Sequence, residues 1–249
     1  MDAEWISSGA KFVLRLVDEL SFEGCLVCRE PTAGAPTCAR HELVRDVAAR
    51  CRRCARRLPS EARDGSRCRR CRARAPAIAA CHVAGSYTRP LSEWILAWKH
   101  RPAPALVVPL ARRVIERLDE LAQPGIVVPI PQHPLRRLER GADGVGALAE
   151  ELAAARGARF CRALRRTRAT RPQGEPGARS RASNVADVFA VTRRGRRRVP
   201  VASAWLVDDV ITTGATLNEA ARTLRRAGVG RVVGIAIARA ENDVVQSGP

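Results

Sequence analysis

Two adjacent carboxylates, Asp208 and Asp209, follow an apolar stretch and precede a turn rich in threonine and glycine, which opens a helical pattern. Ligands of open α/β sheets bind at the carboxyl ends of strands, and the free N–H groups of a helix N-terminus attract phosphate. Glycine lets the backbone approach an anion closely, and hydroxyl groups add hydrogen-bond donors. The turn is therefore expected to bind a phosphomonoester through Thr212, Thr213, Gly214, Ala215 and Thr216.

The acidic pair narrows the class of ligand. Two carboxylates would repel a phosphate, so a hydroxylic or positive group should lie between them, and a ribose diol with Mg²⁺ nearby meets this need. The sequence lacks the Gly-x-Gly-x-x-Gly of a dinucleotide site and the Gly-Lys-Thr of a Walker loop. A receiver-type phosphoacceptor does not explain the turn, and a helix cap explains only one or two of its residues. The pattern predicts a ribose 5-phosphate site.

Nine cysteines are present, and seven of them fall between Cys25 and Cys71, in a segment without aromatic residues. Two Cys-x-x-Cys pairs complete the closed tetrahedral site of a structural Zn²⁺. The later pairs have the spacing of a zinc ribbon, whereas the earlier pairs need one histidine as a ligand. We expect two zinc sites with sequential pairing, although an interleaved arrangement would use the same residues: Cys25, Cys28, Cys38 and His41, then Cys51, Cys54, Cys68 and Cys71.

The elements that position these residues follow from the apolar pattern. A first segment, 1–20, is expected to form an amphipathic helix, and the cysteine-rich segment 21–82 buries so little apolar surface that it needs metal to fold. From 83 to 249, short apolar runs alternate with helical stretches, which predicts an α/β fold with a parallel sheet flanked by helices. Strands are expected at 126–131, 202–207 and 232–238, helices at 91–99, 105–122, 144–157 and 215–227, and a flexible loop at 165–183.

The formal net charge of +19 favours anionic partners, but almost all of it comes from arginine in a chain crowded with alanine and arginine. A GC-rich genome produces the same bias, so the charge alone does not identify a partner. The N-terminus lacks the basic start of a signal peptide, and no apolar run is long enough to span a membrane. A cytoplasmic protein with reduced cysteines is expected.

The acidic pair and its turn resemble the 5-phosphoribosyl-1-pyrophosphate (PRPP) motif of type I phosphoribosyltransferases, and most of the chain is similar to the ComF family. That family combines such a domain with an N-terminal double zinc ribbon. Residues 142–144 depart from it, since Ala-Asp-Gly stands where Phe-Asn-Gln is common, and Pro176 replaces a usual leucine. Further matching residues are Lys99, the stretch 128–134, Arg136, Arg137, Arg140, Gly141, Gln173, Arg181, Asn184, Val185 and Phe189.

The resemblance implies a glycosyltransferase that moves phosphoribose from PRPP to a nitrogen acceptor. Asp208 and Asp209 would hold the ribose hydroxyls, the turn would hold the 5-phosphate, and Lys99 and Arg140 would stabilise the departing diphosphate with Mg²⁺. The loop at 165–183 would close over the site.

The resemblance also implies an alternative, a non-catalytic or regulatory module in DNA uptake, whose basic zinc ribbons contact single-stranded DNA or a competence helicase. The cysteine-rich segment lacks the aromatic side chains on which single-strand binders stack bases. It is therefore expected either to contact phosphate groups or only to support the larger domain. The acceptor and the oligomeric state stay open.

Overall fold

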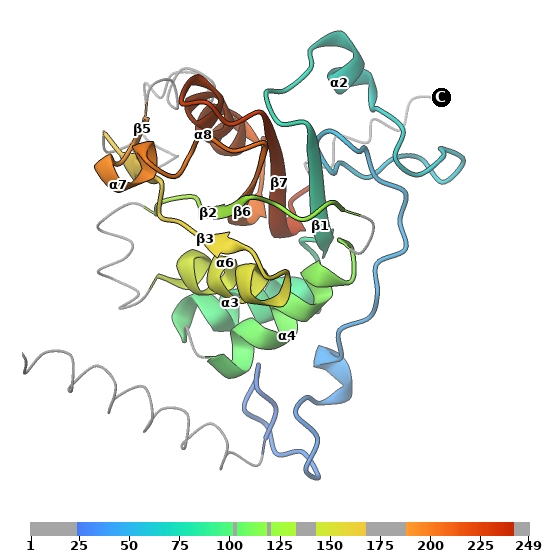
Figure 1. Ribbon diagram of the computed structural model, residues 1–249. Helices are drawn as coiled ribbons and strands as arrows, with labels where there is room; N and C mark the ends of the chain where they lie inside the picture. Colours follow the sequence, from blue (N-terminus) through green and yellow to red (C-terminus); the bar gives the residue numbers. More distant parts are fainter. Residues whose placement is uncertain (1–23, 102–103, 119–120, 133–142, 168–187, 242–249) are drawn as a thin grey trace, which may run out of the picture.

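The computed structural model of the chain describes residues 24–101, 104–118, 121–132, 143–167 and 188–241. Within these residues, five parallel strands form one sheet in the order β1-β7-β6-β2-β3 (Figure 1). The central strands are apolar runs buried on both faces, as a parallel sheet covered by helices requires. The strands are β1 (Ala80–Ser86), β2 (Ile126–Pro129), β3 (Arg159–Phe160), β6 (Ser203–Ile211) and β7 (Arg231–Arg239).

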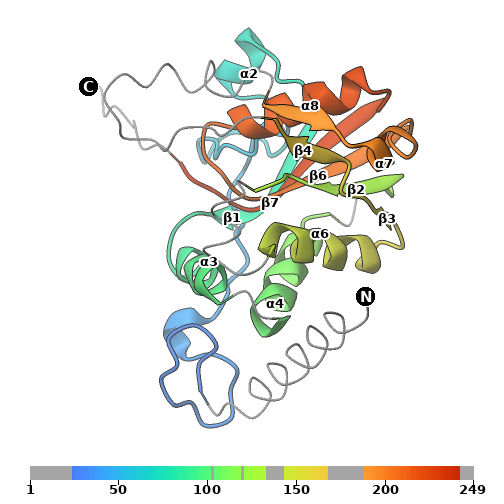
Figure 2. The same ribbon diagram turned by 90° about the vertical axis from the view of Figure 1, so that its left-hand side faces the viewer.

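Helices cover both faces of the sheet (Figures 1 and 2). One face carries α3 (Leu91–His100), α4 (Pro104–Ile115) and α6 (Gly144–Ala155). The other carries α8 (Ala215–Arg226), the short α7 (Arg193–Arg196) and an antiparallel hairpin of β4 (Leu164–Arg166) and β5 (Phe189–Val191). A hydrophobic core lies on each face of the sheet. Trp98 and Trp205 are buried in the core on the face with α3, α4 and α6, and Leu206 and Leu217 are buried in the core on the face with α8. The predicted α/β fold, a parallel sheet flanked by helices, is confirmed.

Residues 24–79 form little regular structure, namely the 3-10 helix η1 (Ala39–His41) and the short α2 (Arg69–Ala73). An irregular connection over 42–49 separates two lobes (Figure 1). The lobe around η1 lies against α3, and the lobe that includes α2 lies beside β1. The two cysteine-rich lobes therefore sit on different parts of the sheet domain.

The expected elements agree with the structure in type and differ in extent. The helix expected over 105–122 ends at Ile115, and the strand expected over 202–207 continues through the acidic pair to Ile211, because β7 pairs with it that far. Strand β1, which spans the expected boundary between 82 and 83, was not predicted, since its sequence is rich in alanine, glycine and cysteine. The first residues of the expected loop belong to β4. The amphipathic helix expected over 1–20 and the part of the expected loop from 168 to 183 lie outside the described residues.

Candidate functional site

Asp208 and Asp209 lie on the part of β6 that extends past β2. Pairing with β2 ends at Val207, whereas pairing with β7 continues to Ile211. The backbone N–H of Asp209 donates to Asp208 Oδ1 (2.9 Å), and the N–H of Val210 donates to Asp209 Oδ1 (2.6 Å). One oxygen of each carboxylate is thus fixed by the adjacent backbone, which orients both side chains at the carboxyl edge of the sheet.

The two carboxylates have different partners. Asp209 Oδ2 lies 2.8 Å from the Nζ atom of Lys99, which reaches it from the last turn of α3, and both side chains are mostly buried. For Asp208, burial and then the neighbouring Asp209 carboxylate raise the pKa to about 7, against the opposing effects of the Asp209 N–H, Lys99 and Arg166. The pair therefore combines one carboxylate held by a lysine with one that titrates near neutral pH.

The threonine-rich turn leads directly from β6 into α8. Gly214 is the N-cap residue of α8 and has a φ of +78°, a left-handed conformation that glycine adopts without strain. Thr213 Oγ1 accepts a hydrogen bond from the N–H of Ala215 (3.3 Å), and no acidic residue occupies the first turn of the helix. Thr212 is exposed. The N-terminus of this twelve-residue helix is accessible to an anion beside the acidic pair.

Arg166 lies close enough to Asp208 to oppose the rise in its pKa. It belongs to β4, its Nε donates to the carbonyl of Pro131 (2.8 Å), and its guanidinium lies over the ring of Phe189, 5.2 Å from the centroid. Arg166 falls within the loop expected over 165–183, and no role was predicted for it. The short antiparallel pairing of β4 with β5 brings it near Asp208, and no local sequence signal could have located that contact.

The departure at 142–144 has a structural explanation. Asp143 is the N-cap of α6, accepts a hydrogen bond from the N–H of Gly146 (2.9 Å) and pairs with Arg162. A Cβ atom on Gly144 would lie 2.8 Å from Cζ2 of Trp98, so the α6 terminus packs on that indole. The acidic side chain is thus neutralised by a helix end and an arginine. Arg136, Arg137, Arg140 and Gly141 lie outside the described residues.

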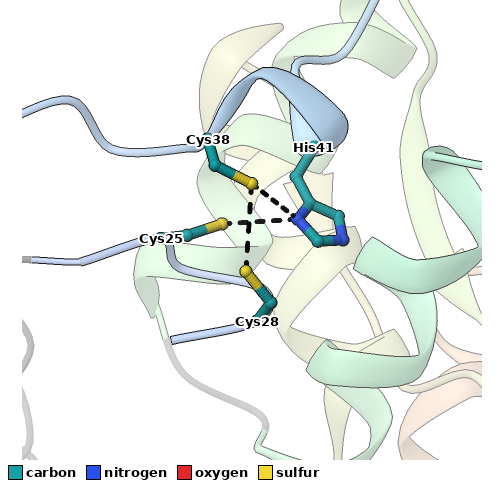
Figure 3. A group of neighbouring side chains, drawn as sticks. All are labelled: Cys25, Cys28, Cys38 and His41. Carbon is teal, nitrogen blue, oxygen red and sulfur yellow. Dashed lines mark hydrogen bonds between the residues drawn. The ribbon is translucent and has the colours of Figure 1, made fainter. Parts of the chain in front are cut away.

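Within the described residues, two groups of side chains could each hold a metal ion, and they follow the sequential pairing. In the first, His41 Nδ1 lies 3.2 Å from Cys38 Sγ and 3.5 Å from Cys25 Sγ (Figure 3). The Sγ atoms of Cys28 and Cys38 are 3.8 Å apart. Sulfur ligands of a tetrahedral Zn²⁺ lie about 3.8 Å apart, given a Zn–S distance of about 2.3 Å. The donor set of three thiols and one imidazole fits zinc.

The second group has four thiols, from Cys51, Cys54, Cys68 and Cys71. The Sγ atoms of Cys54 and Cys68 are 3.7 Å apart, and the N–H of Cys68 donates to Cys51 Sγ (3.2 Å). This spacing also fits a tetrahedral zinc ion. Arg239, at the end of β7, donates from Nη1 to the carbonyl of Cys54 (2.6 Å), so this group is attached to the sheet.

Both groups use the same backbone turn. The N–H of the residue four positions after the first cysteine donates to that cysteine's carbonyl, Arg29 to Cys25 and Ala55 to Cys51, each at 2.8 Å. Arg29 and Ala55 are the non-glycine residues with positive φ in the described part of the chain. At Cys25 burial opposes ionisation, but N–H groups of Cys28, Cys38 and Val27 outweigh it and lower the pKa to about 6. The lowered pKa favours the thiolate form of Cys25, the form that binds a metal ion.

No helix in the described parts of the chain has the length and apolar character needed to cross a bilayer. No family model matches the chain. The chain is 29% identical to competence protein F of Haemophilus influenzae over 170 residues, which cover 64% of this chain and 72% of that protein. It is 31% identical to DNA utilization protein YhgH of Salmonella typhi over 155 residues, which cover 59% and 66%.

Two solved structures are also similar, each with a TM-score of 0.36 and each matched over a quarter of its own length. The allosteric regulatory enzyme of purine biosynthesis is 18% identical and matches 52% of this chain; glutamine PRPP amidotransferase from B. subtilis is 19% identical and matches 51%. The sequence relatives, the two cysteine groups and the parallel sheet together support the resemblance of the chain to the ComF family.

Proposed function

We propose that the chain binds PRPP with Mg²⁺ at the carboxyl edge of the sheet and transfers its phosphoribosyl group to a nitrogen acceptor. One observation carries the proposal: Asp208 and Asp209 lie near the carboxyl end of β6, in the same strand–turn–helix unit in which Gly214 opens α8. Carboxylates accept hydrogen bonds from ribose hydroxyls, and a helix N-terminus with no acidic residue in its first turn attracts the 5-phosphate. A ribose 5-phosphate is the ligand class that uses both features.

In this proposal the residues act by position and charge. The bond from ribose C1 to diphosphate breaks as the acceptor nitrogen forms its own bond to C1, so positive charge develops on the ribose. Asp208 and Asp209 stabilise that charge, and the stretch from Thr212 to Thr216 holds the 5-phosphate. Lys99 and Arg140 stabilise the leaving diphosphate, whose oxygens bind Mg²⁺. The ion pair of Lys99 with Asp209 supports a lysine at this edge of the site.

We also propose that each cysteine group binds one structural Zn²⁺. Four donors fill a tetrahedral coordination sphere, so neither site has an open position for catalysis. The cysteine-rich lobes have little apolar core of their own, and metal binding would supply folding free energy.

A second candidate function is a binding or regulatory role in DNA uptake or utilisation in the cytoplasm. The names of the two relatives favour it, and the formal net charge of +19 is compatible with single-stranded DNA or a helicase partner. Binding of single-stranded DNA through arginine–phosphate contacts should weaken steeply with added salt.

Calorimetry with PRPP and Mg²⁺ tests the first proposal directly. The wild-type chain should bind PRPP, and the double variant Asp208→Asn/Asp209→Asn should lose at least about tenfold in affinity while it stays folded, because each carboxylate removed deletes charge-assisted hydrogen bonds. Glu116→Gln is the matched control, because Glu116 is an exposed glutamate that follows α4 and pairs with Arg113. Equal affinity of the wild type and the double variant would contradict the site.

A screen for diphosphate release across bases, amines and nucleic acids then separates the two functions. Release with one acceptor class identifies a transferase and its acceptor. PRPP binding without release across the panel would favour the regulatory function.

A further inference from the structure

Helix α3 contacts both the first cysteine group and the acidic pair. Its first turn carries Glu93 and Trp94, which face the group around His41, and its last turn carries Lys99, which pairs with Asp209. The buried face of the helix, with Trp94, Ile95 and Trp98, anchors it in the core shared with α4 and α6. A single rigid element of ten residues thus joins the two sites.

The contact with the cysteine group runs through the histidine ligand. Nδ1 of His41 faces the thiols, while Nε2 lies 3.2 Å from Glu93 Oε2 on the other side of the ring. When Nδ1 binds a metal, Nε2 carries the ring hydrogen and donates it to Glu93. Such a carboxylate partner fixes the tautomer and orientation of a histidine ligand. Trp94 Nε1 donates to the carbonyl of His41 (2.7 Å), in a buried contact.

A further contact holds the other end of α3. Arg101, which follows the helix, donates from Nη2 to the carbonyls of Leu26 (2.8 Å) and Val27 (3.2 Å). These two residues lie between the ligands Cys25 and Cys28. Both ends of α3 are therefore attached to backbone or side chains that the first metal ion would hold together.

The contact with the acidic pair depends on where α3 ends. Lys99 Nζ lies 2.8 Å from Asp209 Oδ2, with exposed fractions of 21% and 18% for the two side chains. The neighbouring Trp98 packs on the N-terminus of α6 at Gly144. A small shift of α3 along its axis would move the ammonium group away from the carboxylate.

We propose that the metal ion of the first cysteine group sets the position of α3 and thereby holds Lys99 against Asp209, with Glu93 as the positioning residue that links His41 to the helix. The inference rests on the proposed zinc binding. It makes the position of the Lys99 ammonium group in the proposed phosphoribosyl site depend on the metal ion. Loss of the ion releases the loops of Cys25, Cys28 and Cys38 from one another. The anchors of α3 loosen, and the lysine withdraws.

The lysine content of the chain allows a direct test, because lysine occurs only at positions 11 and 99. In a Lys11→Arg background, reductive ¹³C-methylation leaves Lys99 as the labelled side chain besides the N-terminus and keeps its charge. The chemical shift of its NMR signal reports the contact with Asp209. The Asp209→Asn variant gives the chemical shift of Lys99 without that contact. Cobalt substitution follows occupancy of the first group, since three thiolates with one imidazole and four thiolates give different absorption spectra.

As a chelator empties the first group, the Lys99 signal should move toward its position in Asp209→Asn. Glu93→Gln should weaken metal binding at the first group about 10–100-fold and move the signal at a lower chelator concentration. Glu30→Gln is the matched control, because this exposed glutamate lies in the same lobe and pairs with Arg40 at the surface. It should change neither measurement.

A Lys99 signal that keeps its wild-type position after the first ion has left would overturn the inference. So would a Glu93→Gln variant whose metal affinity and signal match those of Glu30→Gln. Neither measurement uses PRPP, so the link through α3 is tested even if the chain binds no PRPP. Failure of the first group to take up zinc or cobalt would overturn both the inference and the proposed zinc site, and the metal content of the protein would show it.

Discussion

At Asp208, the ionised carboxylate that the proposed ribose binding uses destabilises the fold when no ligand is bound. Burial and the neighbouring Asp209 carboxylate raise its pKa to about 7, so the folded protein holds a proton there that the unfolded chain, with a pKa of about 3.9, releases. Its ionised form is therefore costly in the absence of a ligand. A ligand that offers hydroxyl donors to this carboxylate would offset that cost.

The sign of this shift gives a prediction for stability. Because the folded-state pKa is raised, the folded state binds more protons than the unfolded state between pH 4 and 7, and stability falls as the pH rises through that window. Asp208→Asn removes the titrating group. In urea unfolding we expect the free energy of unfolding of the variant to exceed that of the wild type by at least about 1 kcal/mol at pH 8, and the difference to disappear at pH 4. A difference that does not depend on pH would contradict the assigned pKa.

Gly144 is the second informative residue. The indole of Trp98 occupies the space that a side chain at this position would need, so Gly144→Ala should cost about 1–3 kcal/mol of stability through overpacking. A double-mutant cycle with Trp98→Phe isolates the contact, and thermal or urea unfolding measures it. A coupling energy near zero would mean that the new methyl group at position 144 does not clash with the Trp98 ring.

At the scale of elements, the strand–turn–helix unit of β6 and α8 positions the candidate site. Its apolar run and threonine-rich turn are local signals, and they predicted both the strand and the helix start at Ala215. The length of β6 was underestimated, because β7 rather than its own sequence extends it past the acidic pair. Strand β1 lacked an apolar run, and the β4–β5 hairpin that brings Arg166 to the edge depends on distant pairing. Contacts of that kind leave no mark in the local sequence.

The turn itself allows a prediction. Gly214 has a φ of +78°, and a Cβ atom there would lie 3.8 Å from Cγ2 of Ile211, an ordinary van der Waals contact, so a substitution acts through the backbone rather than through a clash. Gly214→Ala should cost about 1–2 kcal/mol in unfolding experiments and should weaken PRPP binding, because the α8 N-terminus shifts. Gly214→Asn tolerates the left-handed conformation better and serves as the control. Equal losses in the two variants would argue against a conformational cause.

At the scale of the whole molecule, the two cysteine groups lie against different parts of the sheet domain. The first contacts α3, and the second is attached to the edge formed by β1 and β7. The sequence predicted eight ligands and their grouping, but neither attachment, because the anchoring residues lie up to 191 positions apart. The cysteine-rich lobes are thus attached to the folded core by direct contacts, in addition to the metal ions that we propose for them.

Arg50 carries much of the second attachment. It is buried and donates to Asp46 Oδ2 (2.6 Å), Ser86 Oγ (2.8 Å), the carbonyl of Ala55 (2.9 Å) and Glu241 Oε1 (3.3 Å). Arg50→Met should cost about 2–4 kcal/mol, since it leaves partly buried carboxylates without their partner. Zinc content should stay at the wild-type value, because no ligand is lost. Arg40→Met, which breaks a surface pair with Glu30, should cost less than about 1 kcal/mol in the same unfolding assay.

The left-handed turns at Arg29 and Ala55 bear on how the lobes behave when they lose metal. Neither residue favours that backbone conformation, so in each turn the zinc ion that we propose would work against the local preference of the chain. Release of the proposed ion would let each turn relax at the same place, four residues after the first cysteine. Metal uptake and backbone closure would then be coupled in each lobe, and Arg29→Gly or Ala55→Gly would weaken that coupling by allowing the turn to form before the ion arrives.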